Sequence, residues 1–317
     1  MSLNLSKPHY PFEPIRSITA LSRALGFDVS VLEAAARSAN QSYRQVKPEP
    51  GSTRITFDAL GRLKEIHRRI KDRILSNVHY PDYLQGSLKG RDYVTNARLH
   101  TNKKILICED VKKFFPSVKS EKVRDIWSGV LGFSSDVSSL LTALTTKDGA
   151  LPQGAITSSY LANLALWRDE PLLQAKLAKM GVTYSRYVDD ICMSAAHPLD
   201  KQTQTRLISS VYGMLRRNEL SAGRRKHQVF TANRQMVATK LIVNNKPSLT
   251  KKKRSQLRAQ VHHLELMLQA GEIRDVVTEK ANNASQSIGQ LQRFHPVEAA
   301  KLKRRTQAVR EKANEQL

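Results

Sequence analysis

The segment 182–194 (VTYSRYVDDICMS) places two adjacent carboxylates, Asp189 and Asp190, between two apolar runs. Its β-branched and aromatic residues predict two strands, at 182–187 and 191–194, joined at the acidic pair. Neighbouring side chains on a regular strand point to opposite faces of the sheet, so both carboxylates reach one site only if they occupy the turn. Because turns favour aspartate in any protein, the pair by itself indicates no function.

A third carboxylate ends a short apolar run upstream. The segment 104–110 (KILICED) predicts a central strand that ends at Asp110. If the hairpin pairs beside this strand, the three carboxylates meet, and a divalent cation relieves their mutual repulsion. Mg²⁺ prefers oxygen ligands, and a pair of such ions can activate an attacking sugar hydroxyl and stabilise a leaving pyrophosphate. The three aspartates are therefore the candidate catalytic and metal-binding residues.

The charge of the chain is strongly positive, with 52 Lys and Arg against 28 acidic residues and a net charge of +24. The segment 220–264 contains eleven Lys and Arg residues, among them the run 251–254 (KKKR), and no acid. A stretch this long without a carboxylate favours a polyanionic partner over a solvated basic face. Charge alone does not distinguish DNA, RNA or an acidic protein.

Two cysteines, Cys108 and Cys192, make neither a disulfide framework nor a zinc site and are expected to be buried free thiols. No apolar run reaches the ~18 residues that predict a membrane span, and the first residues lack the apolar stretch of a signal peptide. We therefore expect a cytoplasmic protein that does not associate with a membrane.

Local patterns predict a helical N-terminus. Ser17 and Gly26 bracket one short helix, and a second is expected to start at Ser30 with Glu33 in a capping box. The pair could be a DNA-binding helix-turn-helix, but a small helical cap on a larger domain is favoured. Residues 43–57 predict a hairpin with its turn at 48–51 (PEPG).

Three further motifs give the acidic pair a context. The segment 187–190 (YVDD) matches the Tyr-x-Asp-Asp signature of reverse transcriptases. The segment 151–155 (LPQGA) is similar to their Leu-Pro-Gln-Gly motif, and 110–117 (DVKKFFPS) resembles the bacterial Asp-x-x-x-Phe-Phe-Pro-Ser motif. The segment 96–100 (NARLH) matches the Asn-Ala-x-x-His motif associated with retrons. The chain therefore resembles the bacterial retron reverse transcriptases of the group II intron-like family, firmly over about 43–244.

The resemblance implies an α+β, right-hand polymerase fold, with fingers, a palm built on a small antiparallel sheet, and a helical thumb. The expected domains are an N-terminal helical cap (1–42), a fingers and palm core (43–235) and a basic thumb (236–317). The implied reaction is template-directed transfer of deoxynucleotides (dNTPs) with release of pyrophosphate. For a retron enzyme it also implies a dedicated structured non-coding RNA as template and primer. Part of this RNA is copied into cDNA from one of its own 2′-hydroxyls, which leaves a branched RNA–DNA product (msDNA). The resemblance also implies a companion effector protein and a role in anti-phage defence.

Roles carry over residue by residue. Asp110 and Asp189 are expected to bind two Mg²⁺ ions, or Mn²⁺ as a substitute, with Asp190 less direct and the Val111 carbonyl completing the shell. The expected nucleotide-binding residues are Arg54, Phe115 as a gate against the ribose 2′-hydroxyl, Gln153, Gly154 and Lys226, with Lys64 a weaker candidate. The expected RNA-binding residues are Asn96, His100, Lys252, Lys253, Arg254 and Arg258.

The chain departs from the retron pattern in two places. The Val-Thr-Gly motif falls on 238–240 (ATK), so Lys240 replaces its glycine. Gly223 and His227 stand where retrons more often have Asn and Thr. Two alternatives stay open at this stage. One is another polymerase on the same fold, of the diversity-generating or abortive-infection kind. The other is a binding protein that uses the fold only as a nucleic-acid scaffold.

Overall fold

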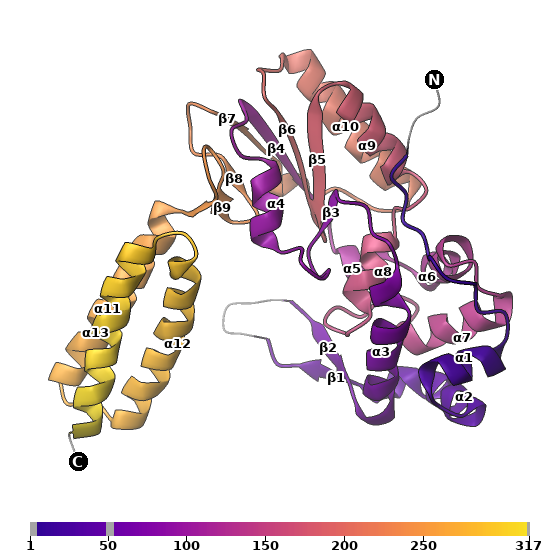
Figure 1. Ribbon diagram of the computed structural model, residues 1–317, viewed down its shortest axis with the longest axis horizontal. Helices are drawn as coiled ribbons and strands as arrows, with labels where there is room; N and C mark the ends of the chain where they lie inside the picture. Colours follow the sequence, from indigo (N-terminus) through magenta and orange to yellow (C-terminus); the bar gives the residue numbers. More distant parts are fainter. Residues whose placement is uncertain (1–4, 49–53, 316–317) are drawn as a thin grey trace.

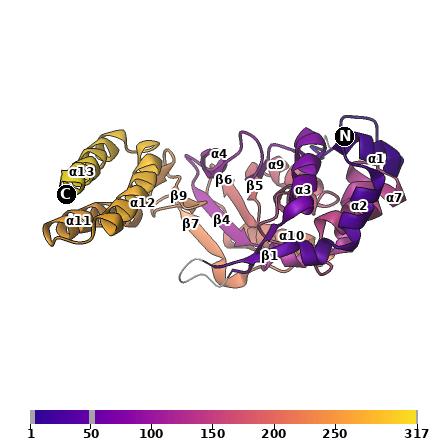
Figure 2. The same ribbon diagram turned by 90° about the horizontal axis from the view of Figure 1, so that it is seen from below.

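The computed structural model describes residues 5–48 and 54–315. The molecule is elongated (Figures 1 and 2). A region of short helices lies at one end, a sheet flanked by helices lies in the middle, and a three-helix bundle lies at the other end. The mixture of helices with a mainly antiparallel sheet agrees with the expected α+β class. Among the described residues, none of the helices combines the length and apolar character that a membrane crossing requires.

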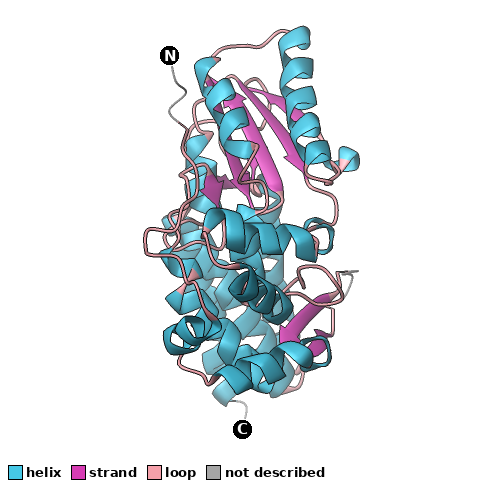
Figure 3. Ribbon diagram, turned by 90° about the vertical axis from the view of Figure 1, so that its right-hand side faces the viewer, coloured by secondary structure: helices cyan, strands magenta, loops and turns pink. Residues whose placement is uncertain are grey.

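The central sheet has the strand order β3-β5-β6-β4-β7. Its β5–β6, β6–β4 and β4–β7 pairs are antiparallel, and the short β3 runs parallel to β5. Figure 3 shows these strands with helices packed against them. The strand bounds are β3 (Leu84–Gln85), β4 (Ile105–Asp110), β5 (Val182–Tyr187), β6 (Asp190–Ala195) and β7 (Gln228–Thr231).

Alternation along β4 divides the core between the two faces of the sheet. Ile105 and Ile107 belong to a large apolar cluster with residues of α9 (Glu170–Lys179) and α10 (Lys201–Arg217). Leu106, between them, faces the other way and packs with residues of α4 (Tyr93–Leu99) and of the C-terminal region. A buried strand covered on both faces in this way holds its last residue, Asp110, at a fixed position.

The N-terminal region packs three helices against the β1–β2 hairpin and α7. Ser17 caps α1 (Ile18–Leu25), and Gly26 ends it with φ 72°, as predicted. The expected start at Ser30 is wrong, because α2 (Val29–Arg37) begins after Asp28. β1 (Tyr43–Val46) and β2 (Thr56–Ala59) form the predicted hairpin, whose turn lies outside the described residues from position 49 onward. The other helices here are α3 (Gly61–Arg73), α5 (Phe114–Ser117), α6 (Ser120–Asp125), α7 (Ser135–Thr145) and α8 (Ser158–Leu164); a π-helical turn, Ile126–Val130, follows α6.

The C-terminal part begins with a small antiparallel sheet of β8 (Val237–Ala238), β9 (Leu241–Ile242) and β10 (Ser248–Leu249). The helices α11 (Lys251–Gln269), α12 (Arg274–Gln292) and α13 (Pro296–Glu315) then form the bundle. On α11, Leu257, Val261 and Leu264 are buried, with Leu268 partly buried.

Candidate active site

The turn between β5 and β6 is tighter than the sequence predicts. Val188 and Asp189 form it, while Asp190 is already the first residue of β6 and pairs with Tyr187. Val188 has φ 57°, a left-handed conformation that is unfavourable for a β-branched residue. The Val188 N–H donates to the Gln85 carbonyl at 3.2 Å, and the Asp189 carbonyl accepts from the Val111 N–H at 2.9 Å. Neighbouring chain segments therefore hold the turn in its strained form.

Strand pairing brings Asp110 to the acidic pair. Asp110 is the direct cross-strand partner of Asp190 and is almost completely buried. Burial, and then the charges of Asp189 and Asp110, raise the pKa of the Asp190 carboxyl to about 6. Burial also raises the pKa of Asp189, against a hydrogen bond that lowers it. The site therefore concentrates negative charge that is poorly solvated.

Two residues of the loop after α10 contact Asp110. The Lys226 ammonium lies 2.5 Å from Asp110 Oδ1. The Gly223 N–H donates to the Asp110 carbonyl at 2.6 Å, and a Cβ at position 223 would lie 2.5 Å from Asp110 Oδ2. The glycine that departs from the retron pattern is therefore the residue that lets this loop approach the carboxylate.

A cavity of about 740 Å³ opens over the three carboxylates. Its lining residues come from segments far apart in the sequence, from Arg54 to Gln290, as is common for ligand-binding sites. Sequence reasoning predicted Arg54, Phe115, Gln153 and Lys226 here. It missed Tyr93, Ser159, Lys240 and the C-terminal Thr250 and Gln290, and it assigned Lys253, which also lines the cavity, only to RNA.

Comparison with known proteins agrees with this geometry. The reverse transcriptase (RNA-dependent DNA polymerase) family profile matches residues 45–257. The chain is 33% identical over 306 residues to the retron Se72 reverse transcriptase of Salmonella heidelberg, a match that covers 94% of this chain and 81% of that protein. The chain belongs to the retron reverse transcriptases. The retron Ec48 and Ec86 reverse transcriptases of Escherichia coli are each 25% identical to it, over 315 and 249 residues. Those matches cover 94% and 77% of this chain and 77% of each relative.

This reverse transcriptase is therefore an RNA-directed DNA polymerase, and its family uses divalent metal ions. The donor set fits such ions in kind, because carboxylates supply the hard oxygen ligands that they prefer. Burial and the neighbouring carboxylates raise the pKa values of Asp189 and Asp190, and a bound cation would offset the repulsion between the charges. Across residues 5–48 and 54–315, no three His, Cys, Asp or Glu side chains already stand together as a metal-binding group. The Lys226 ammonium instead pairs with Asp110. A metal ion at Asp110 therefore requires Lys226 to shift.

The loop that carries Gln153 and Gly154 is fixed by the β1–β2 hairpin. The Phe57 N–H donates to the Gln153 carbonyl at 2.7 Å. Gly154 has φ 102°, and a Cβ there would lie 2.9 Å from the Phe57 carbonyl oxygen. Gly154 thus permits the close approach of the two segments, whereas Gln153 lines the cavity. Lys64 does not line the cavity and instead pairs with Asp58 at 2.7 Å.

Asn96 and His100 do not reach solvent in this reverse transcriptase. Both are 0% exposed, and both contact Ser185 of β5: its hydroxyl donates to Asn96 Oδ1 at 2.7 Å and lies 2.7 Å from His100 Nε2. The other ring nitrogen of His100 lies 2.7 Å from the Ser194 hydroxyl, and burial lowers the pKa of His100 to about 3. Asn96 lies in α4 and His100 follows its last residue, and both side chains face the sheet. The assignment of these two residues to direct RNA contact is therefore wrong for this conformation.

The four residues of α11 expected to bind RNA, Lys252, Lys253, Arg254 and Arg258, have different surroundings. Arg254 and Arg258 both pair with Glu298 of α13, at 2.6 and 2.5 Å, so they connect two helices of the bundle, and their expected contact with RNA stays a prediction. Lys252 is exposed, as expected for a phosphate contact. At Lys240, φ is 68°, so the chain keeps the conformation that the retron glycine favours and adds a cation to the cavity. Cys108 and Cys192 are free thiols, with their sulfur atoms 3.7 Å apart.

Proposed function

We propose that this retron reverse transcriptase copies a dedicated structured RNA into DNA in the 740 Å³ cavity. Asp110, Asp189 and Asp190 would hold two Mg²⁺ ions, or Mn²⁺ in their place, with the Val111 carbonyl as a further ligand. Bound ions would activate the primer hydroxyl and stabilise the charge of the leaving pyrophosphate. The observation that carries this proposal is that three carboxylates, from the end of β4, the β5–β6 turn and the start of β6, line one cavity.

The other cavity residues have separate tasks in this proposal. Lys226 would leave Asp110 and bind the triphosphate, and Arg54 would bind it from the hairpin side. Gln153 would position the nucleotide, and the partly buried ring of Phe115 would exclude a ribose 2′-hydroxyl. These tasks depend only on side chains that line the cavity.

The three regions of the molecule would then correspond to a right hand. The central sheet with α9 and α10 would be the palm, the β1–β2 hairpin with α3 the fingers, and the C-terminal bundle the thumb. The proposed bounds are 1–42 for the helical cap, 43–235 for fingers and palm, and 236–317 for the thumb. The cavity supports this division, because it is lined by Arg54 next to the hairpin and by Lys253 and Gln290 of the bundle. Figure 1 shows the bundle and the hairpin as separate parts of the molecule.

We further propose a retron product and setting. Synthesis would begin from a 2′-hydroxyl of the non-coding RNA and leave branched RNA–DNA, in the cytoplasm, with a companion effector protein in anti-phage defence. Similarity to three retron enzymes supports the proposal. Sequencing the nucleic acid that copurifies with the protein tests it: one RNA species joined to its cDNA through a branch is expected. Linear cDNA from unrelated templates would contradict it.

Selection of that RNA would use exposed cations near the bundle. A cavity of about 320 Å³ between α4, the segment before β10 and the end of α12 is lined by Arg98, Lys246 and Arg293. Arg293 pairs with Asp92, whereas no salt bridge engages Arg98 or Lys246 in the described part of the chain. With Lys252, these two residues are the better candidates for phosphate contacts, and the shape of the cavity would add selectivity.

A further inference from the structure

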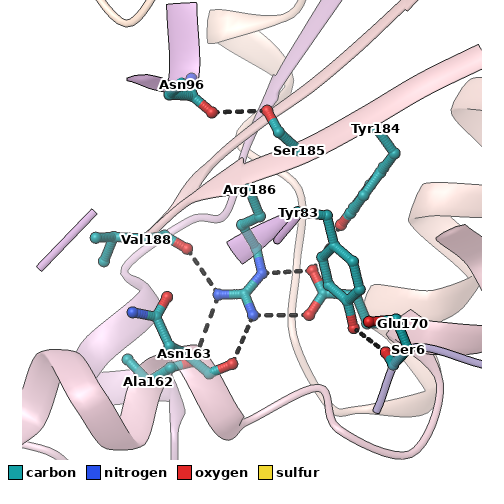
Figure 4. A network of polar contacts seen from close by, with 10 residues as sticks. All are labelled: Ser6, Tyr83, Asn96, Ala162, Asn163, Glu170, Tyr184, Ser185, Arg186 and Val188. Carbon is teal, nitrogen blue, oxygen red and sulfur yellow. Dashed lines mark hydrogen bonds and ion pairs between the residues drawn. The ribbon is translucent and has the colours of Figure 1, made fainter. Parts of the chain in front are cut away.

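Arg186 is a charged residue with no exposed surface, four positions before Asp190 on β5. Burying a guanidinium is costly unless every donor finds an acceptor. Its Nε and Nη2 donate to the two carboxylate oxygens of Glu170, at 2.6 and 2.7 Å. Tyr184 donates to the same carboxylate at 2.7 Å. The charge is therefore neutralised on one side by a bidentate ion pair (Figure 4).

The remaining N–H groups of Arg186 point away from Glu170, toward α8 and toward the Val188–Asp189 turn, called here the catalytic turn. Nη1 donates to the Val188 carbonyl at 3.0 Å and to the Ala162 carbonyl at 3.5 Å. Nη2 also donates to the Asn163 carbonyl at 2.9 Å. All five donors of the guanidinium are thus used, and three of the hydrogen bonds go to backbone carbonyls that only a side chain of this length and shape reaches together (Figure 4).

The Val188 carbonyl belongs to the peptide group that leads into Asp189. Because a peptide group is planar, fixing its oxygen fixes the direction in which the Asp189 backbone continues. Val188 is held at φ 57°, a strained conformation that persists only where the surroundings enforce it. Arg186 holds the carbonyl of this residue, and Gln85 holds its N–H.

The same guanidinium connects the catalytic turn to α8. This helix follows the nucleotide loop, defined here as the segment that carries Gln153 and Gly154. Ala162 and Asn163 lie in the last turn of α8, where the helix dipole attracts a cation, and the Ala162 carbonyl also accepts from the Ala165 N–H at 3.2 Å. Asn163 also donates to the Gly86 carbonyl at 3.0 Å, beside the ring of Tyr187. The catalytic turn and the nucleotide loop therefore share one buried support.

We propose that Arg186 is a positioning residue for nucleotidyl transfer. It fixes the Val188–Asp189 peptide so that the Asp189 carboxylate shares one space with Asp110 and Asp190, and it sets the turn against the nucleotide loop. The inference rests on the proposed metal role of Asp189. A purely structural role for the Arg186–Glu170 pair would instead affect only the amount and stability of folded protein.

Two single variants separate these roles. Arg186→Lys keeps a positive charge beside Glu170 but lacks the planar fork that reaches Val188. Glu170→Gln removes the ion pair but leaves an oxygen for Nε and leaves the bond to Val188. Both variants lose stability, so turnover is measured per folded molecule, with the fraction folded taken from near-UV circular dichroism well below each melting temperature. The substrate is a pre-annealed DNA primer on an RNA template.

Arg186→Lys is expected to lower kcat roughly tenfold to a hundredfold, the range for misplacing a reacting group by about 1 Å. It should also weaken Mn²⁺ binding, measured from the free-ion electron paramagnetic resonance signal, with little change in KM for the nucleotide. Glu170→Gln should keep both properties close to wild type. Arg186→Lys with wild-type kcat and Mn²⁺ binding, or equal losses in the two variants, would overturn the proposal.

If Arg186→Lys does not fold, the double variant Arg186→Gln/Glu170→Gln replaces it. The two amides can bond to each other without a buried charge, and neither reaches Val188 in the way that arginine does. The double variant is expected to fold and still lose kcat and Mn²⁺ affinity; wild-type values for both would overturn the proposal. Asp189→Asn serves as the reference: if it keeps activity, the metal assignment fails whatever Arg186 does.

Discussion

The crowding of carboxylates at the candidate active site predicts that Asp190, a proposed catalytic residue, lowers the stability of the metal-free protein. The pKa of Asp190 rises from 3.8 to about 6, because of burial and then the charges of Asp189 and Asp110. At ~1.4 kcal/mol per pKa unit, a shift of this size corresponds to at most about 3 kcal/mol. Asp190→Asn removes the charge and nearly preserves the shape. It should abolish DNA synthesis and yet raise the free energy of unfolding.

The pH dependence of this gain follows from the direction of the shift. Above about pH 6 the folded protein carries Asp190 ionised against its neighbours, and the full penalty applies. Between pH 6 and pH 4 the folded state binds a proton that the unfolded state does not, so the penalty shrinks as the pH falls. The variant should therefore be more stable than wild type at pH 8, by up to about 3 kcal/mol, and equally stable near pH 4.

Urea unfolding in EDTA at several pH values measures this difference. Asp200→Asn is the control, because Asp200 caps α10, its pKa is lowered by hydrogen bonds from Thr203, and asparagine also caps helices well. The control should show no gain at any pH. An Asp190→Asn protein no more stable than wild type at pH 8, or a gain that persists unchanged at pH 4, would refute the electrostatic reasoning.

Three other variants test separate parts of the protein. Phe115→Ala should admit ribonucleotides more readily in single-turnover competition, because the 2′-oxygen meets space instead of a ring; an unchanged preference would make Phe115 a packing residue. Gly223→Ala should lower kcat roughly tenfold or more, because its methyl group displaces the Asp110 carboxylate; unchanged kcat would show that the loop yields instead. Replacing Arg98 and Lys246 with Ser should weaken binding of the cognate RNA and lower its salt slope by about one unit for each phosphate that is no longer bound. Extension of a generic pre-annealed primer at saturation should hardly change, and equal loss of both activities would show a general nucleic-acid clamp.

Local patterns in the sequence predict the parts of the site that depend on neighbouring residues. Alternating apolar residues around Asp189 and Asp190 specify the hairpin, and the apolar run before Asp110 specifies the strand beside it. The fixed register of a buried sheet then brings the carboxylates together. A cap-like pattern at Ser30 misplaces the start of α2, because Asp28 offers an equally good start two residues earlier.

Contacts between distant segments could not be predicted in the same way. The spacing of Asn96 and His100 predicts that their side chains lie on one side of a helix, but not that both contact Ser185. The pairing of Arg254 with Glu298 depends on how the bundle folds, so neither residue reveals it alone. Arg186 stands next to the signature motif, yet its burial and its bond to Val188 follow only from the packing of the sheet against α8 and α9.

Primer extension by Asp189→Asn tests the central claim, that this chain makes DNA from RNA at its three aspartates. Wild type and variant are compared on the same RNA template and DNA primer with Mg²⁺, and again with EDTA. Folding and RNA affinity are measured alongside. The variant should fold, bind RNA nearly as well as wild type and extend no primer, and EDTA should stop the wild type. Extension by the variant within about tenfold of wild type would contradict the account. Removing a single hydrogen-bond donor to a transition state typically costs ~10²–10³-fold in kcat, and removing a metal ligand should cost at least as much.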